Sequence, residues 1–258
     1  MKIVMIGTGN IGTYYSTCFK QHGHEIIQVV SNTESHAKAL SNTLGCNYTT
    51  KIEELHQGAD VYFFAIQDDA LLKLSKQLKL EDKLVMYAAG ALSNENFLSM
   101  SKEVACIWCV YSIQKNNLPR HRRIPLVVTG TSKNACYKAH KLAESISDLV
   151  YEMDEDKKAI VHLGAVFSNN FVNHLYHISE NLLTENDISF DILKPIIQNT
   201  AEKIMLHASK ELQTGPAIRN DQSTMQKHVA LLNPTPQTQH IYEVISKSIQ
   251  TLQEPAKN

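Results

Sequence analysis

The sequence predicts an α/β domain with a doubly wound parallel sheet, followed by an all-α domain. Over residues 1–153, short apolar stretches alternate with helix-like stretches, which is typical of βαβ units joined by right-handed crossovers. From about residue 156 onward the sequence contains no convincing strand, and only long helical stretches follow. We therefore predict two domains, one over residues 1–153 and the other over residues 154–258.

The predicted strands are short runs of apolar residues, as expected where helices cover both faces of a parallel sheet. After a first strand at the N-terminus, they lie at about residues 25–30, 61–66, 84–88, 105–110 and 124–129. The helices between them are expected at about residues 11–22, 31–44, 69–78 and 133–149. Ligands of such folds bind beyond the carboxyl ends of the strands.

The helical half is expected to contain helices at about residues 156–184, 189–212, 221–232 and 235–253. In the first of them, apolar residues recur at helical spacing and predict a buried core stripe. The stripe consists of Ile160, Leu163, Phe167, Phe171, Leu175, Ile178 and Leu182. Because the class of structure changes near residue 153, we expect a cleft between the two domains, and ligands favour such clefts.

The composition is that of an ordinary globular protein and argues against several classes of partner. The formal net charge of −1 gives no reason to expect nucleic acid or an anionic membrane surface as a partner. No apolar run approaches the roughly 20 residues that span a bilayer. Because the first predicted strand starts at the N-terminus, we expect no signal peptide. We expect a cytoplasmic protein that acts on a small molecule.

The five cysteines lie within predicted core elements, which fits a reducing compartment. Cys106 and Cys109 form a CxxC sequence inside a predicted strand. Side chains three residues apart in a strand point to opposite faces, so we expect two core thiols instead of a redox or metal centre. The histidines show neither HExxH nor a compact cluster with carboxylates, so no metal site is expected.

Three glycines follow the first strand at the spacing of a dinucleotide-binding turn. Gly7 is expected to make the tight turn, Gly9 to let the backbone approach a pyrophosphate, and Gly12 to let the helix pack on the strand. Backbone N–H groups at the start of that helix form an anion site. The candidate cofactor-binding residues here are Gly7, Thr8, Gly9, Asn10, Ile11 and Gly12. Alternatively, the glycines serve packing alone and no nucleotide binds.

The residues at the end of the second strand favour NADP over NAD as the cofactor. An acidic residue at this place hydrogen-bonds the ribose 2′-hydroxyl of NAD, but the chain has Ser31, Asn32 and Thr33. Small hydroxyl and amide groups accommodate a 2′-phosphate that a carboxylate would repel. Glu34 opposes this preference, and no arginine stands beside it. Lys38 either supplies the missing positive charge or is a solvated lysine on the helix surface.

Two further loops are expected to contact the cofactor. Ile66 and Gln67 leave the carboxyl end of the third strand near the riboses, while the following Asp68 or Asp69 is a candidate helix N-cap. Ala89 lies in a turn of small residues after the fourth strand, which would let the backbone lie against a nicotinamide ring. Small residues in a tight turn also need no such explanation.

Polar side chains in the helical half are the candidate catalytic residues. His162, Asn169 and Asn173 are separated by seven and four residues, so an α-helix would place them on one face. They line a cavity or, alternatively, form a domain interface or dimer contact through their hydrogen bonds. Arg219 lies in a turn and suits a carboxylate or phosphate, unless it pairs with Asp221 at the surface. Asp221 is expected to cap the next helix.

Several segments follow one another in the order found in a known bacterial family. They are the glycine turn, residues 65–70, residues 111–114 with 124–126, residues 162–169, and residues 215–221 with His228. Together they resemble a family with an N-terminal Rossmann-like NADP-binding domain and a C-terminal helical domain of unknown function. That family is grouped with NADP oxidoreductases of the pyrroline-5-carboxylate reductase and 6-phosphogluconate dehydrogenase type. The resemblance covers nearly the whole chain.

The resemblance implies an architecture and a set of site residues. It implies a cofactor on the sheet, a substrate between the sheet and a 6-phosphogluconate dehydrogenase-like helical domain, and a homodimer formed through the C-terminal helices. By position, the matching polar residues are Gln114, His162, Asn169, Arg219, Asp221 and His228. Related hydroxyacid dehydrogenases place a lysine on the first helix of this domain as acid/base, and here His162 is the nearest candidate.

Two functions follow from these residues. The first is a reductase that transfers hydride between NADPH and a carbonyl, imine or hydroxy-acid substrate. His162 would donate the proton, since histidine changes charge near neutral pH, Asn169 would polarise the substrate, and Arg219 would hold an anionic group. The second is a non-catalytic protein that binds NADP(H) or senses a metabolite with the same fold.

Overall fold

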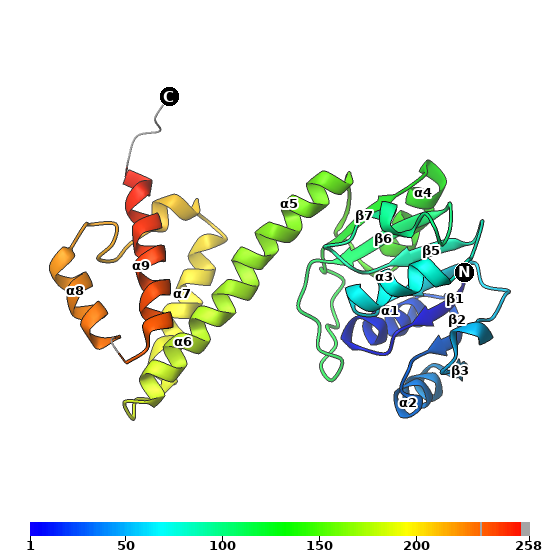
Figure 1. Cartoon of the computed structure of the whole chain (residues 1–258), viewed down its shortest axis with the longest axis horizontal. Coiled ribbons are helices and arrows are strands. Elements are labelled where there is room, and N and C mark those ends of the chain that lie inside the picture. Colours follow the sequence, from blue (N-terminus) through cyan, green and yellow to red (C-terminus); the bar gives the residue numbers. More distant parts are fainter. Residues whose placement is uncertain (233, 254–258) are drawn as a thin grey trace. The chain divides into compact units, whose positions relative to one another are not determined.

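The computed structural model describes residues 1–232 and 234–253. The chain forms two compact units, Met1–Ser168 and Asn169–Asn258, and Figure 1 shows a sheet with helices in the first and helices in the second. The predicted domain boundary between residues 153 and 154 rests on the change of secondary-structure class and stays a prediction. Among the described residues, no helix is both long and apolar enough to reach across a bilayer.

The first unit is built on an eight-stranded sheet with the order β3-β2-β1-β4-β5-β6-β7-β8. The strands are β1 (Lys2–Ile6), β2 (Glu25–Val30), β3 (Asn47–Thr49), β4 (Val61–Phe64), β5 (Leu84–Tyr87), β6 (Val104–Cys109), β7 (Leu126–Gly130) and β8 (Val150–Glu152). The strand order reverses between β1 and β4, which pair in parallel. In doubly wound sheets this reversal opens a crevice at the carboxyl ends of the strands, where ligands bind.

Helices cover both faces of this sheet, which explains why its strands are apolar on both sides. They are α1 (Asn10–Gln21), α2 (Glu34–Leu44), α3 (Asp68–Gln77), α4 (Lys133–Ile146) and α5 (Glu155–Ala165), with short 3₁₀ turns at Ile52–Glu54 and Asn94–Phe97. One core contains Tyr15 and Phe19 of α1, and the other contains Leu71 of α3. Two apolar cores, one on each face, hold the layers together.

The predicted fold class is confirmed as a mostly parallel sheet of Rossmann type, with one correction. The sequence predicts parallel strands throughout, but β7 runs antiparallel to β6. The reason is the connection, because residues 110–125 between these strands contain no helix, and a parallel neighbour needs a crossover. The sequence pattern does not predict β3 and β8, each of which is three residues long and lies at an edge of the sheet.

The CxxC sequence lies in β6 as two buried thiols. Cys106 and Cys109 are free cysteines, and they belong to the cores on opposite faces of the sheet. This placement agrees with the prediction, because side chains alternate along a strand. Burial raises the pKa of the Cys106 thiol to about 12 and that of the Cys109 thiol to about 12. Both therefore stay neutral at physiological pH.

The second unit consists of helices, short turns and loops in its described residues. Its helices are α6 (Val172–Thr184), α7 (Lys194–Ile204), α8 (Gln222–Leu231) and α9 (Pro236–Gln250). The predicted continuous helix over residues 189–212 is wrong, because α7 begins only at Lys194, with Pro195 in its first turn. Proline lacks a backbone N–H and clashes with the preceding turn, so it suits the start of a helix but not its interior.

The apolar stripe that the sequence predicts as core is largely exposed in the single chain, because five of its seven side chains are exposed and only Ile178 and Leu182 are half-buried. Ile160 is 70% exposed and Phe167 is 61% exposed, and Leu163 and Phe171 are exposed as well. The side chains lie on helical segments, but the burial of such a stripe requires a partner surface. The prediction of a buried stripe is therefore wrong for the single chain, and these side chains belong to its apolar surface.

Candidate cofactor-binding and catalytic site

The turn after β1 has the geometry that its three glycines predict. Gly7 has a φ of 115°, and a Cβ added to it would lie 2.2 Å from the carbonyl oxygen of Ala65. A Cβ on Gly12 would lie 2.1 Å from the carbonyl oxygen of Gly7. A Cβ on Gly9 would meet no described atom within 4 Å. The protein itself thus requires Gly7 and Gly12, whereas Gly9 borders open space that a ligand can fill.

This open space lies at the N-terminus of α1. Gly9 is the N-cap, and within the described part of the chain no side chain caps the helix and its first turn carries no acidic residue. The amide groups of this turn therefore have no side-chain acceptor and, together with the helix dipole, present positive charge. A pyrophosphate fits such a cradle.

A cavity of about 850 Å³ opens beside the glycine turn. The candidate cofactor residues that line it are Gly7, Thr8, Gly9, Ser31, Asn32, Thr33, Ile66 and Gln67. The Thr8 hydroxyl donates to Ser31 Oγ at 2.9 Å, which ties the glycine turn to the end of β2. The remaining candidates do not line it, and they are Asn10, Ile11, Gly12 and Ala89. The volume is within the usual range of cofactor sites.

Basic and acidic side chains that are not among the candidates predicted from the sequence also line this cavity. Lys73 comes from α3, Lys51 from the segment after β3, and His36 from the first turn of α2. Glu53 is an acidic residue of the same lining, and Lys38 is not part of it. No short-range pattern marks Lys51, because it reaches the cavity after a strand that the sequence does not predict.

His162 lies on α5 against the loop that follows β5. Its ring centroid is 5.3 Å from that of Trp108, with an angle of 54° between the ring planes. A Cβ added to Gly90 would lie 2.7 Å from His162 Cδ2 and 2.5 Å from Trp108 Cε2. Both rings therefore pack on the bare backbone of Gly90. Ala89, the predicted neighbour of the nicotinamide, directly precedes this glycine.

Asp68 brings a carboxyl group close to His162. Asp68 is the first residue of α3 and follows the N-cap Gln67, so the prediction that Asp68 or Asp69 is the N-cap is wrong. Burial raises the pKa of the Asp68 carboxyl, and the nearby His162 partly opposes that rise. The loop after β4 thus contributes an acid, and α5 an imidazole, to the same region of the first unit.

The other two candidate catalytic residues belong to the second unit. Asn169 lies in the π-helical segment Val166–Phe171, and Arg219 lies in an exposed turn before α8. Asp221 caps α8 by accepting a hydrogen bond from the Thr224 amide at 3.1 Å, as its position predicts. Arg219 is therefore presented from a turn that is anchored at the start of a helix.

The π-helical segment changes the helical spacing on which the predicted common face of three polar residues depends. The prediction that His162, Asn169 and Asn173 share one face assumes an α-helix with about 3.6 residues per turn. The segment Val166–Phe171 begins after His162 and contains Asn169, and a π-helix has i→i+5 hydrogen bonds and a wider turn. A seven-residue spacing therefore does not define a common face here. Such π-helical turns occur frequently at functional sites.

Two residues that match the family by position have local partners. The ring of His228 on α8 forms a hydrogen bond between Nδ1 and the Tyr242 hydroxyl of α9 at 2.9 Å. Gln114 is exposed and forms an isolated β-bridge with Asn117. His228 therefore joins two helices of the second unit.

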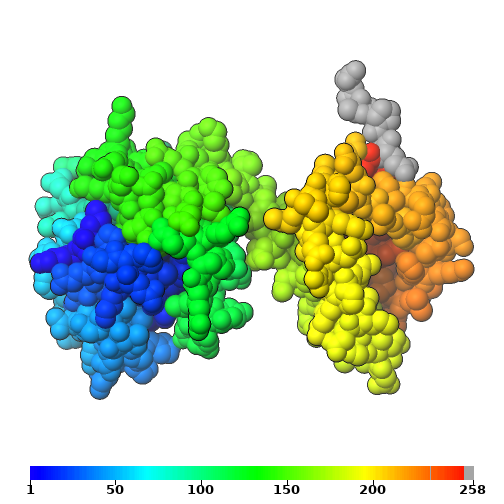
Figure 2. Space-filling model, turned by 180° about the vertical axis from the view of Figure 1, so that it is seen from behind, coloured from blue at the N-terminus to red at the C-terminus, as the bar shows by residue number. Residues whose placement is uncertain are grey.

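The segment of residues 110–125 lies against the start of α1. The backbone N–H of Lys115 donates to Asn10 Oδ1 at 3.1 Å, and Figure 2 shows this green segment beside the blue N-terminal residues. Lys115 also lines a small cavity together with Thr8 and His36. The loop between the antiparallel strands thus borders the glycine turn.

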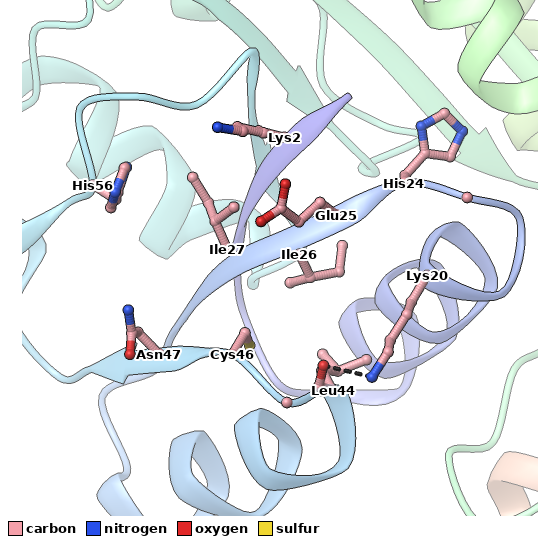
Figure 3. Close-up of a pocket in the computed structure, with 12 residues that line it drawn as sticks. Lys2, Lys20, His24, Glu25, Ile26, Ile27, Leu44, Cys46, Asn47 and His56 are labelled. Carbon is pink, nitrogen blue, oxygen red and sulfur yellow. Dashed lines mark hydrogen bonds between the residues drawn. The ribbon is translucent and has the colours of Figure 1, made fainter.

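A separate cavity lies at the opposite edge of the sheet, at the amino ends of β1 and β2 (Figure 3). Lys2 and Glu25 line it, and the Lys20 ammonium donates to the carbonyl oxygen of Leu44 at 2.6 Å. None of the candidate cofactor or catalytic residues is in its described lining. This cavity is therefore separate from the site around Gly9.

The sheet, the glycine turn and the cavity beside it define a dinucleotide-binding protein of the Rossmann class. Among the described residues, no group of three or more histidines, cysteines and acidic residues is placed to hold a metal ion. Residues 2–89 match the family described as NADP oxidoreductase coenzyme F420-dependent, and residues 124–249 match a domain of unknown function, DUF2520. The two matches occur in the order that the resemblance predicts.

A solved structure from Bacteroides fragilis shows the family of the whole chain. That Bacteroides protein, named "putative NADP oxidoreductase BF3122", is 30% identical to this chain. The match covers 96% of this chain and 97% of that chain with a TM-score of 0.88. The protein therefore belongs to this family of NADP oxidoreductases. The predicted resemblance is confirmed.

More distant structures share the fold. Protein TM1727 from Thermotoga maritima is 22% identical, with a TM-score of 0.79 and coverage of 97% of this chain and 98% of that chain. The 1-pyrroline-5-carboxylate reductase from Streptococcus pyogenes is 14% identical, with a TM-score of 0.64 and the same two coverages of 97% and 98%. A comparison with curated protein sequences gives no match. The fold with a Rossmann-type sheet and a helical C-terminal part is thus shared along the full chain.

Proposed function

We propose that the protein is an NADPH-dependent reductase that acts on a small carbonyl or imine compound, or on the corresponding hydroxy acid in reverse. The observation that carries the proposal is the place of His162, which packs with Trp108 on Gly90 after the carboxyl end of β5. Ligands of doubly wound sheets lie beyond these strand ends. This edge therefore offers a proton donor where a nicotinamide ring would bind.

The proposed reaction combines a hydride and a proton. NADPH, when bound, supplies the hydride to the carbon of the C=O or C=N group. His162 donates a proton to the oxygen or nitrogen as negative charge develops there, which gives the alcohol or the amine. Trp108 covers one side of the imidazole and limits its contact with water. The carboxylate of Asp68 attracts the positive charge of the imidazolium before the proton leaves.

Asn169 and Arg219 are proposed to bind the substrate. An amide side chain polarises a carbonyl or imine, and an exposed guanidinium suits a carboxylate. The reductase from Streptococcus pyogenes is named for 1-pyrroline-5-carboxylate, a cyclic imine that carries a carboxylate. This name supports acidic cyclic imines as the first compounds to test.

NADP(H), rather than NAD(H), is the proposed cofactor. Ser31, Asn32 and Thr33 offer no carboxylate to a ribose 2′-hydroxyl. Lys51 and Lys73 line the same cavity, and a lysine ammonium attracts a phosphate as a compact positive charge. The cavity therefore suits a nucleotide with an additional phosphate.

A homodimer through the helices of the second unit is proposed from its exposed apolar surface. Ile196 is 61% exposed and Met205 is 82% exposed, whereas Ala217 and Leu232 are the buried apolar residues of the described part of this unit. Exposed apolar surface of this kind marks interaction sites. A second copy presents the same surface, so a twofold contact covers both at once.

The cytoplasm is the proposed compartment, with neither nucleic acid nor a membrane as partner. All five cysteines are free thiols, which fits a reducing environment. The formal net charge of −1 favours no polyanionic partner.

The proposal is tested by following NADPH oxidation with a panel of keto acids and cyclic imines, alongside a direct measurement of NADPH binding. His162→Ala is expected to bind NADPH as the wild type does and to lose turnover. Binding of NADPH without oxidation by any compound would favour a non-catalytic cofactor-binding or sensing protein. Unchanged turnover in His162→Ala would remove His162 from the mechanism.

A further inference from the structure

Lys158 is a buried cation on α5, four residues before His162. Its side chain is 2% exposed, and its ammonium forms an ion pair with Glu155 at 2.7 Å. The same ammonium donates to the carbonyl oxygen of Leu92 at 2.6 Å and to the Tyr87 hydroxyl oxygen at 3.1 Å. An ammonium has three N–H donors, and the protein uses all of them.

Glu155 extends this network to β7. One of its carboxylate oxygens accepts a hydrogen bond from the Thr129 hydroxyl at 2.6 Å, while the other pairs with Lys158. Asn94 Nδ2 donates to the same Thr129 hydroxyl oxygen at 2.9 Å. Buried polar contacts thus join α5 to β5, to β7 and to the chain between β5 and β6.

The loop that Lys158 holds is also the loop on which His162 rests. Leu92, whose carbonyl group binds Lys158, lies two residues after Gly90, against which the His162 ring packs. Residues four apart on an α-helix lie on the same face. Lys158 and His162 therefore face this loop together, one through hydrogen bonds and the other through its ring.

We propose that Lys158 is a positioning residue for His162. Its contacts hold α5 against the loop after β5, so that the imidazole of His162 stays over Gly90 and beside Trp108. The inference rests on the proposed function only in treating His162 as the proton donor. Lys158 itself does not serve as the acid, because its ammonium is committed to three protein groups.

Stability alone does not account for this choice of side chains. Removal of an ammonium and a carboxylate from water costs free energy, and well-packed apolar side chains of similar size often stabilise a protein as well or better. A hydrogen-bonded ion pair differs from an apolar contact because it demands one geometry. The adjacent Lys157 differs from Lys158, because it pairs with Asp154 at 3.0 Å at the surface and its side chain is 74% exposed.

Trp108 allows the position of His162 to be measured, because it is the only tryptophan of the chain. A protonated imidazole in contact with an indole quenches its fluorescence, so the wild type is expected to show a step in emission during a pH titration. His162→Gln is expected to abolish that step. Lys158→Met is expected to lose most of it, whereas the matched control Lys157→Met keeps it.

Turnover gives a second measurement once a substrate is found. Lys158→Met is expected to lower kcat by about 10- to 100-fold, as small displacements of a catalytic group do. The Kd for NADPH is expected to stay unchanged, because the cavity beside Gly9 does not include Lys158. The fluorescence titration needs no substrate, so a failure of the proposed reductase activity is distinguishable from a failure of this inference.

Glu155→Gln provides a second variant if Lys158→Met does not fold. It keeps the volume of the side chain, removes the charge that faces Lys158, and is expected to reduce the emission step in a protein with a native circular dichroism spectrum. A full wild-type step in either folded variant would overturn the inference. A wild-type protein without a step that depends on His162 would overturn it as well.

Discussion

The imidazole of His162 and the indole of Trp108 use the backbone of Gly90 as a common contact surface. Their ring centroids are 5.3 Å apart, and a Cβ on Gly90 would come within 2.7 Å of both rings. One ring comes from α5 and the other from β6, which are distant in the sequence. A helix, a strand and a loop therefore meet where even one additional methyl group has no room.

Gly90→Ala is expected to destabilise the protein by about 1–3 kcal/mol, since overpacking forces side chains to move. The matched control is Gly164→Ala, on α5, where an added Cβ meets no described atom within 4 Å. That control is expected to raise the free energy of unfolding by roughly 0.5–1 kcal/mol, because alanine favours a helix. Urea unfolding measures both. Equal stability of Gly90→Ala and the wild type would contradict the close packing of His162 and Trp108 on Gly90.

Substitutions in the glycine turn are expected to separate folding from binding. Gly9→Ala meets open space, so its melting temperature should match the wild type while NADPH binding weakens by about tenfold or more, a loss of roughly 1.4 kcal/mol or more. Gly12→Ala would place a Cβ 2.1 Å from the carbonyl oxygen of Gly7, so it should lower the melting temperature first. Calorimetric titration and thermal unfolding test this. Tight NADPH binding by Gly9→Ala would argue against a pyrophosphate at this turn.

Lys73→Ala is expected to weaken the binding of NADPH more than that of NADH. The loss of one partly solvated charge contact is worth about 1 kcal/mol, or roughly fivefold in Kd. Lys76→Ala is the control, because Lys76 lies on the same helix outside the cavity lining. Titrations with both nucleotides are followed by Trp108 emission. An equal effect on NADPH and NADH would show that Lys73 does not sense the 2′-phosphate.

Asp68 is expected to make stability fall as pH rises. Burial raises its pKa above the ordinary value of 3.8, so the folded state holds this proton more tightly than the unfolded chain. The free energy of unfolding therefore decreases as pH rises from 3.8 through the higher pKa of the folded state. Asp68→Asn removes this titration. The difference between the melting temperature of Asp68→Asn and that of the wild type should therefore rise as pH increases over the same interval.

The control for this pH effect is Asp69→Asn, at the exposed neighbouring position. An equal rise in the melting temperature of Asp69→Asn would show that the effect does not come from the carboxyl of Asp68. Thermal unfolding at a series of pH values measures both variants. A decrease with rising pH in the melting temperature of Asp68→Asn relative to the wild type would contradict the burial of the Asp68 carboxyl.

Ile196→Asp is expected to shift a dimer toward monomers. A charge on exposed apolar surface has no partner when a second copy covers it, and its desolvation is costly. The control is Asn199→Asp, which adds the same charge at an exposed polar position of α7. Light scattering should give the wild type twice the chain mass of 29.0 kDa and Ile196→Asp a lower mass. A monomeric wild type would contradict the homodimer.

The glycine turn could be predicted because its requirements are local. The positive φ of Gly7 and the close contact of Gly12 arise within a few residues and from the strand beside them. The periodicity of the stripe around Ile160 was equally local. Its burial was not, because that depends on a surface that the helix meets only after folding or association.

Contacts between distant segments could not be predicted in the same way. Lys158 looks like any lysine on a helix until Tyr87 and Leu92, about seventy residues earlier, are brought to its ammonium. The cavity residue Lys51 depends likewise on β3, whose three residues carry too little pattern to mark a strand. Residue type and spacing give no information about such pairings.

The reversal of β7 has a consequence for the direction in which the chain leaves the sheet. β6 ends at the carboxyl edge, and β7 and its parallel neighbour β8 both run back from that edge. The chain therefore enters α5 at the amino edge, where Glu155 lies beside Thr129, and α5 runs toward the carboxyl edge, where His162 contacts Trp108. If β8 instead ran parallel to β6, α5 would start at the carboxyl edge, where the cofactor is proposed to bind, and would run away from that edge. The directions of β7 and β8 thus decide whether a histidine near the end of this helix lies at the carboxyl edge of the sheet.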